Sequence, residues 1–259
     1  MKKKLILLLL IASILLIFSC QRNEGATSRT VSSAENSQIA VSSIQNPGFA
    51  LVVNTGFYTL AGADDGEETT KMKWTTSLSL GDDVMTGNTR RLTLDSNNRV
   101  YNVIEVRRTN GTEGYSLANQ VVPGGRLAVV IDERANLHRT PRPVDVTGTI
   151  LSRRSVIVYY PETESNGFVE VRGYDIARNA FVDSNVSFVR LSTLSRRDSD
   201  IQSSIMLQTA MPLVAANQAI QREALLKSAL DEYPDSVFYE EIYELAFPKT
   251  TSVIFEEGY

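Results

Sequence analysis

The side chains best suited to catalysis are scarce in this sequence. Cys20 is its only cysteine and His138 its only histidine, so no zinc site built from several such ligands can form. A Ser-His-Asp triad would have to use His138, which we expect in a loop. The sequence contains no Gly-x-Ser-x-Gly, His-Glu-x-x-His or phosphate-loop motif. It therefore predicts a protein that is not an enzyme and holds no metal or cofactor.

Carboxylates are the remaining candidates for chemistry, in two clusters at residues 64–68 and 82–83. A glycosidase needs two carboxyl groups held about 5–10 Å apart across a cleft. The first cluster lacks the alternating oxygen ligands of a calcium loop. We interpret both clusters as solvated loops, and an enzyme that uses carboxylates alone stays open as an alternative.

The N-terminus has the pattern of a signal peptide. Residues 2–4 are lysines, and residues 5–18 form an apolar run of 14 residues, which is short for a membrane-spanning helix of about 20 residues. Residues 16–20, which end in Ser19 and Cys20, resemble the lipobox of bacterial lipoproteins in the relaxed form familiar from spirochaetes.

The lipobox resemblance implies a lipoprotein signal peptide over residues 1–20 and acylation of Cys20. The lipid would hold the protein on the cell membrane or the outer membrane, facing the periplasm or the cell surface. A plain anchor helix and a secretory signal cut elsewhere remain the alternatives. Residues 21–47 are mostly small and polar and predict a flexible tether with a span of roughly 30 Å.

Residues 49–194 have a pattern of short strands. Several runs rich in β-branched and aromatic residues are separated by turn signals such as Asn110-Gly111 and Asn166-Gly167. The runs cover residues 49–53, 100–106, 127–131, 155–160 and 168–172. We expect a mainly β region of small barrels or sandwiches.

This region also repeats internally, with a break at residues 123–125. A shift of 78 residues places residues 50–53 on residues 128–131, and the run from Trp74 aligns with the run from Val146. The segment after Gly114 aligns with the segment after Ala180, which places Tyr115 opposite Phe181. The repeat predicts two units, at residues 48–122 and 126–195.

The two units resemble the bacterial SH3-like (SH3b) domain. Residues 135–141 (Ala-Asn-Leu-His-Arg-Thr-Pro) are similar to the opening motif of that family, and residues 148–151 to its Gly-Thr-Leu strand. Residues 80–84 resemble its turn, and Gly114-Tyr115 stands at its Gly-Trp position. The resemblance implies two small SH3-like barrels in tandem, with a long loop at residues 86–98. Another pair of small β units, such as two sandwich halves, is the alternative.

The pattern becomes helical at residues 198–248. Ile201, Ile205 and Leu213 recur at helical spacing, a second helix is expected over residues 215–233, and a third over residues 237–246. The end of the second helix resembles a tetratricopeptide-type hairpin, but one hairpin is too few for a solenoid. We expect a short helical segment that caps the second barrel.

Charge is distributed unevenly between the two regions. Residues 49–197 carry 18 basic and 17 acidic side chains, whereas residues 198–259 carry 3 and 11. The acidic tail and the balanced middle argue against nucleic acid as a partner. Arginine pairs stand at 90–91, 107–108, 153–154 and 196–197, and we interpret them as solvated strand ends and turns. The functional alternative is contact with an anionic glycan, with phospholipid head groups or, preferred among these, with the acidic tail.

Aromatic side chains are the candidates for ligand binding. SH3-type domains bind extended ligands in a groove lined by flat side chains, and five residues are predicted to line such grooves: Tyr58, Trp74, Tyr115, Tyr174 and Phe181. The alternative places them in the core, Trp74 and Phe181 above all. The expected partner is a peptidoglycan peptide or an extended segment of an envelope protein, in addition to the membrane. A scaffold that acts through its acidic tail, with the barrels as spacers, is the second hypothesis.

Overall fold

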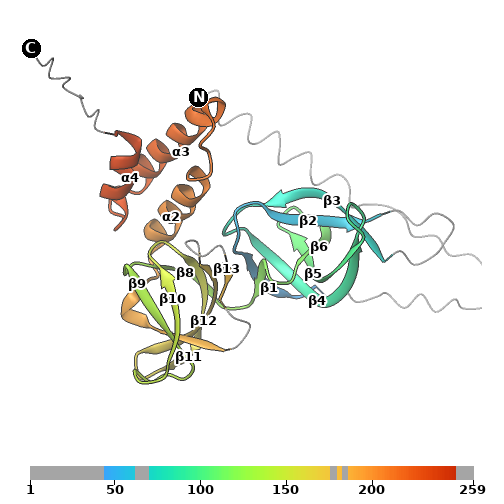
Figure 1. Ribbon diagram of the computed structural model, residues 1–259, viewed down its shortest axis with the longest axis horizontal. Helices are drawn as coiled ribbons and strands as arrows, with labels where there is room; N and C mark the ends of the chain where they lie inside the picture. Colours follow the sequence, from blue (N-terminus) through green and yellow to red (C-terminus); the bar gives the residue numbers. More distant parts are fainter. Residues whose placement is uncertain (1–43, 62–69, 176–179, 183–185, 249–259) are drawn as a thin grey trace, which may run out of the picture. The chain divides into compact units, whose positions relative to one another are not determined.

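Two β-sheets and three α-helices make up the described part of the chain (Figure 1). The computed structural model describes residues 44–61, 70–175, 180–182 and 186–248, all within the compact unit Val41–Tyr259. The signal peptide, Cys20, most of the tether and the acidic cluster at 64–68 lie outside these residues. Within them, no helix is long and apolar enough to span a membrane.

The first sheet runs from Asn46 to Pro123. Its order is β3-β2-β6-β5-β4-β1-β7, and a parallel pairing of Lys71 and Met72 with Thr93 and Leu94 also joins β3 to β4. The pairing path through five of the strands therefore returns to its start. The strands are β1 (Asn46–Ala50), β2 (Thr55–Leu60), β3 (Lys71–Leu78), β4 (Asp83–Leu94), β5 (Arg99–Arg108), β6 (Glu113–Leu117) and β7 (Val121–Pro123).

The second sheet has the order β10-β9-β14-β12-β11-β8-β15, with β13 attached to β12. Matched strand for strand, this order is the same as that of the first sheet, and it agrees with two repeated units. The expected shift of 78 residues is wrong by two, because Ala50 of β1 pairs in its sheet as Val130 of β8 does in the other. The strands are β8 (Arg126–Val130), β9 (Arg134–His138), β10 (Val146–Ser152), β11 (Val156–Ser165), β12 (Phe168–Asp175), β13 (Ala180–Phe181), β14 (Ser187–Arg190) and β15 (Leu194–Ser195).

Three local expectations about the strands were wrong. The expected loop at residues 86–98 is mostly strand, because β4 continues to Leu94 and pairs with β5, with a register shift between Thr86 and Thr89. His138 is not in a loop but ends β9, where it pairs with Val146 and Phe188 and is 4% exposed. The alignment of Tyr115 with Phe181 also fails. Strand order matches β6 with β14, whereas Phe181 lies on the additional strand β13.

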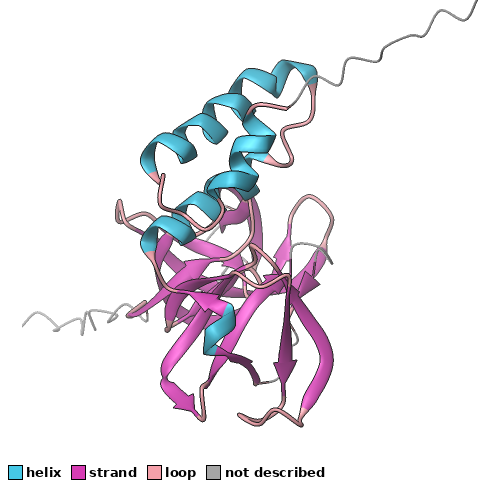
Figure 2. Ribbon diagram, turned by 90° about the vertical axis from the view of Figure 1, so that its left-hand side faces the viewer, coloured by secondary structure: helices cyan, strands magenta, loops and turns pink. Residues whose placement is uncertain are grey.

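Three helices follow the second sheet: α2 (Asp198–Ala210), α3 (Ala219–Glu232) and α4 (Tyr239–Ala246). The expected face running on to Leu213 is wrong, because α2 ends at Ala210. Pro212 ends it, since proline lacks the N–H of the helical ladder and restricts the residue before it. Figure 2 shows the three helices lying together at one end of the β-structure.

One hydrophobic cluster joins the helices to both sheets. Leu207, Phe238 and Ile242 pack in it together with Val129, Val156 and Val158 of the second sheet. Leu51, Leu80 and Val122 of the first sheet belong to the same cluster. The helices thus cover the second sheet, as a cap would, and the first sheet shares this core.

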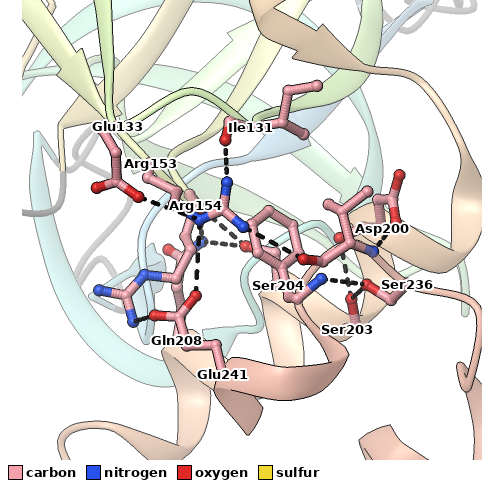
Figure 3. A network of polar contacts seen from close by, with 12 residues as sticks. Ile131, Glu133, Arg153, Arg154, Asp200, Ser203, Ser204, Gln208, Ser236 and Glu241 are labelled. Atoms are coloured by element: carbon pink, nitrogen blue, oxygen red, sulfur yellow. Dashed lines mark hydrogen bonds and ion pairs between the residues drawn. The ribbon is translucent and has the colours of Figure 1, made fainter.

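Arginines reinforce the helical contact (Figure 3). Arg153 donates hydrogen bonds to the carbonyls of Ile131 and Val237, and its guanidinium lies 4.9 Å from the centre of the Phe238 ring. Arg154 forms a 2.7 Å ion pair with Glu241 of α4. Arg197 pairs with Asp235 in the α3–α4 turn. At Arg153, Arg154 and Arg197 the structure therefore shows the alternative, contact with the acidic tail, in place of the expected solvated turns.

A buried carboxyl group orders the start of α2. The side chain of Asp200 is fully buried and accepts hydrogen bonds from the Ser195 hydroxyl and from the Val237 N–H, the latter at 2.8 Å. Nearby, the hydroxyls of Ser203 and Ser236 lie 2.6 Å apart. These bonds connect the end of the second sheet, α2 and the turn before α4.

The two sheets differ in the turn between β3 and β4 and the matching turn between β10 and β11. Gly81 and Arg154 occupy matching positions, because the N–H of each donates to the equivalent carbonyl of β1 or β8. Both have positive φ, 84° and 73°, a conformation that is costly for a residue other than glycine. The Arg154 carbonyl accepts hydrogen bonds from Ser204 and Gln208 of α2, so the helix stabilises the strained turn.

Candidate ligand-binding site

Three of the five predicted aromatic residues form a row across the first sheet. Tyr58 of β2 is the cross-strand partner of Trp74 on β3 and of Tyr115 on β6. Directly opposed residues of antiparallel strands share one face, with Cβ atoms about 5 Å apart. We call Trp74, Tyr58 and Tyr115 the aromatic row. The structure thus brings together residues that are up to 57 positions apart in the chain.

Exposure differs along the aromatic row. Trp74 is 61% exposed, so it is not a core residue. Tyr58 and Tyr115 are partly buried and pack against a small cluster of Met72, Leu92 and Val103. The row therefore presents a free aromatic ring at one end and two rings fixed by packing beside it.

Gly56 makes room for the central ring. A Cβ atom at this position would lie 2.5 Å from the Tyr58 hydroxyl oxygen and 2.7 Å from ring carbons, so the Tyr58 ring lies against the backbone of its own strand. Burial raises the pKa of Tyr58, and the neighbouring Tyr101 raises it further. Tyr58 is accordingly neutral around pH 7, with a hydroxyl that can donate or accept a hydrogen bond.

The second sheet lacks an equivalent row. Strand order matches β2, β3 and β6 with β9, β10 and β14, where the cross-strand partners are His138, Val146 and Phe188. His138 is buried and contacts Phe168 edge to face at 4.8 Å. Only the first sheet carries three aromatic side chains at these positions.

The other two predicted residues, Tyr174 and Phe181, form a separate pair. They are cross-strand partners on β12 and β13, and their rings meet edge to face at 5.0 Å. Burial, together with the adjacent Asp175, raises the pKa of Tyr174. Tyr174 lines a cavity of about 390 Å³ beside α2. Phe181 lines a different hollow, so these residues do not extend the aromatic row directly.

Phe181 lines a cleft of about 520 Å³ between the two sheets, which we call the inter-sheet cleft. The first sheet contributes Tyr101 and Leu117 to it, and the second contributes Arg172 and Phe181. Two of these residues, Tyr101 and Arg172, were not predicted as site residues from the sequence. Tyr101 could have been found from the strand alternation, since it shares a face with Val103 and Glu105 on β5.

The acidic cluster at residues 82–83 lies at the start of β4. Asp82 precedes the strand and Asp83 begins it, and the Asp82 carboxyl accepts a hydrogen bond from the Ser79 N–H at 2.8 Å. They line a hollow of about 350 Å³ together with Arg108. Among the described residues, no group of three histidine, cysteine or acidic side chains is placed to hold a metal ion.

Comparisons with known proteins add little to this geometry. No family model matches the chain, and no curated protein matches it. Among solved structures, "Structure of NlpC2 from Trichomonas vaginalis" is similar over 66% of this chain, at 10% identity and a TM-score of 0.20. The chain spans 57% of the length of that structure.

Proposed function

We propose that this protein is a lipid-anchored, non-catalytic binding protein of the bacterial cell envelope. Acylated Cys20 would hold it on the membrane, and two SH3-like barrels would form its folded part. The first of these would hold an extended peptide, such as a peptidoglycan stem peptide or a segment of an envelope protein. The aromatic row is the observation that carries this proposal.

The chemistry of the row favours an extended, flat-lying ligand. A large aromatic side chain that is 61% exposed beside two partly buried ones presents apolar area with little conformational freedom to lose on binding. Tyrosine and tryptophan are the residues that most often dominate binding energy for this reason. Aromatic side chains whose Cβ atoms lie about 5 Å apart across strands suit consecutive groups of a chain laid across the sheet.

The alternative scaffold function has less support. It requires the acidic tail to act as a free working surface, with the barrels as spacers. The helices instead pack in a core with both sheets, and Asp200, Asp235 and Glu241 are engaged within the protein.

Replacing Trp74 by alanine tests the proposal. We expect Trp74→Ala to weaken retention on purified peptidoglycan sacculi about tenfold or more, because a binding aromatic contributes 1–2 kcal/mol or more. The measurement is a pull-down titration with the full chain in detergent. Tyr243→Ala is the control, since Tyr243 is also an exposed aromatic, at 47%, but lies on α4.

Trp74 is the only tryptophan of the protein, so tryptophan fluorescence reports directly on this site. Binding over the aromatic row should shift the emission of the wild-type protein to shorter wavelength as the indole leaves water. Retention of Trp74→Ala equal to that of the wild type would overturn the proposed site. If the wild type is retained no better with sacculi than in a control without sacculi, peptidoglycan is not the ligand.

A further inference from the structure

We infer that the inter-sheet cleft binds the carboxylate-bearing end of an extended peptide, with Arg172 as the residue that recognises the carboxylate. This inference rests on the proposed function and names the chemistry of the ligand beyond the aromatic row. Three observations carry it: the continuity of the cleft with the row, its charge, and the fixed position of its walls.

The cleft continues the surface of the aromatic row. Tyr101 and Leu117 line the cleft, and both pack in the same small cluster as Tyr58 and Tyr115. Leu117 lies two residues after Tyr115 on β6, so both side chains lie on one face of the strand. A chain that crosses Tyr58 and Tyr115 would therefore reach the cleft without leaving this face.

The lining of the cleft is mostly apolar and has one charge. Arg172 is the only ionisable side chain besides Tyr101 among the described residues that line it, and none of these is acidic. The amides of Asn102 and Asn119 supply further donors. An apolar recess with one guanidinium and amide donors is complementary to an apolar group that ends in a carboxylate.

The Arg172 side chain has a defined orientation, and its guanidinium can still bind a second carboxylate. Its guanidinium lies 5.6 Å from the centre of the Tyr160 ring, which favours a fixed orientation. Its ion pair with Glu170 is long, at 3.8 Å, and its side chain is 52% exposed. Arginine carries five N–H donors in a planar fork, so a second carboxylate can be bound bidentately from the cleft side.

The two walls of the cleft are fixed to each other. The Tyr160 hydroxyl donates a 2.9 Å hydrogen bond to the carbonyl of Pro123, which lines the cleft from the first sheet. Gly125 lies two residues after Pro123 and has no room for a side chain, because a Cβ atom there would lie 2.3 Å from a side-chain carbon of Val158. The volume of about 520 Å³ is within the range of sites for small ligands.

The test compares two peptides that differ only in their terminal charge. N-acetylated tetra-alanine as the free acid and as the C-terminal amide would be titrated into the full chain in detergent micelles, followed by amide chemical shifts of Asn102 and Gly173. We expect the wild type to bind the acid at least about fivefold more tightly than the amide. Arg172→Gln should abolish this preference. Arg190→Gln should keep it, because Arg190 lies over Phe168 on β14, away from the cleft residues.

The outcomes separate this inference from the proposed function. Equal affinity for acid and amide, binding of neither peptide, or an unchanged preference in Arg172→Gln would overturn the inference, even where Trp74→Ala reduces retention on sacculi. Conversely, a preference that depends on Arg172, with sacculus retention unaffected by Trp74→Ala, would support the cleft and refute the aromatic row as the main site.

Discussion

Replacing Phe238 by alanine should lower the free energy of unfolding by about 3–5 kcal/mol, the usual cost of removing a buried phenylalanine. Phe238 has no exposed surface and packs in the cluster that joins the helices to both sheets. Its ring also lies under the guanidinium of Arg153. The alanine variant would lose this contact and leave a cavity. Urea unfolding followed by circular dichroism measures the change.

Phe247→Ala is the matched control for this prediction. Phe247 immediately follows α4 but is 44% exposed, so its truncation should cost less than about 1 kcal/mol. The shared core contains residues from both sheets. The unfolding transition of Phe238→Ala should therefore move to lower urea concentration in the β-sheet signal of the spectrum as well as in the helical signal. A change confined to the helical signal would show that the helices unfold independently and that the shared core contributes little.

Replacing Asp200 by alanine is expected to have the second largest effect, a loss of about 2–4 kcal/mol. The change removes the acceptor for the Ser195 hydroxyl and for the Val237 N–H, both at buried or partly buried sites. Buried donors without acceptors cost about 1–3 kcal/mol each, and more where the lost partner is charged. Thermal unfolding of the purified variant measures this loss.

Asp198→Ala separates the hydrogen-bond network from the general effect of an acid at a helix start. Asp198 lies in the same first turn of α2 but is exposed. It therefore shares the favourable interaction with the helix dipole, worth about 0.3–1 kcal/mol, without the buried contacts. Equal losses for the two variants would show that the network around Asp200 has no stabilising role.

The secondary structure could be predicted because it depends on local patterns. Alternating apolar residues predicted β5 and β12, and the change to helical spacing after Leu194 predicted the three helices. The strand at residues 86–94 was missed, because Gly87 and the polar residues after it obscure the alternation. The end of α2 was misplaced because spacing alone was followed past Pro212.

The candidate site could be predicted only in part, since strand register is not a local property. From the sequence, Tyr58, Trp74 and Tyr115 could be identified as aromatic residues of one unit. Only the pairing of β2 with β3 and β6 places them in a row. Tyr115 and Phe181 were aligned because each is an aromatic residue followed by a short polar turn. The alignment is wrong because Phe181 lies on β13, which has no counterpart in the first sheet. The inter-sheet cleft depends on packing between distant segments, so strand alternation could have indicated Tyr101 but not the cleft that it lines.

The position of β1 between two other strands affects how the protein would respond to a pulling force. β1 is hydrogen-bonded to β4 on one side and to β7 on the other, and just before it Ile44 is 5% exposed, with its carbonyl bonded to Arg107 at 2.6 Å. Antiparallel hydrogen bonds run perpendicular to the strands. A pull on the N-terminal side of β1 along the axis of the strand would therefore load both ladders in shear, with their bonds sharing the load. If the proposed acylation of Cys20 anchors the protein, the strand that first takes up such a load is thus hydrogen-bonded on both sides.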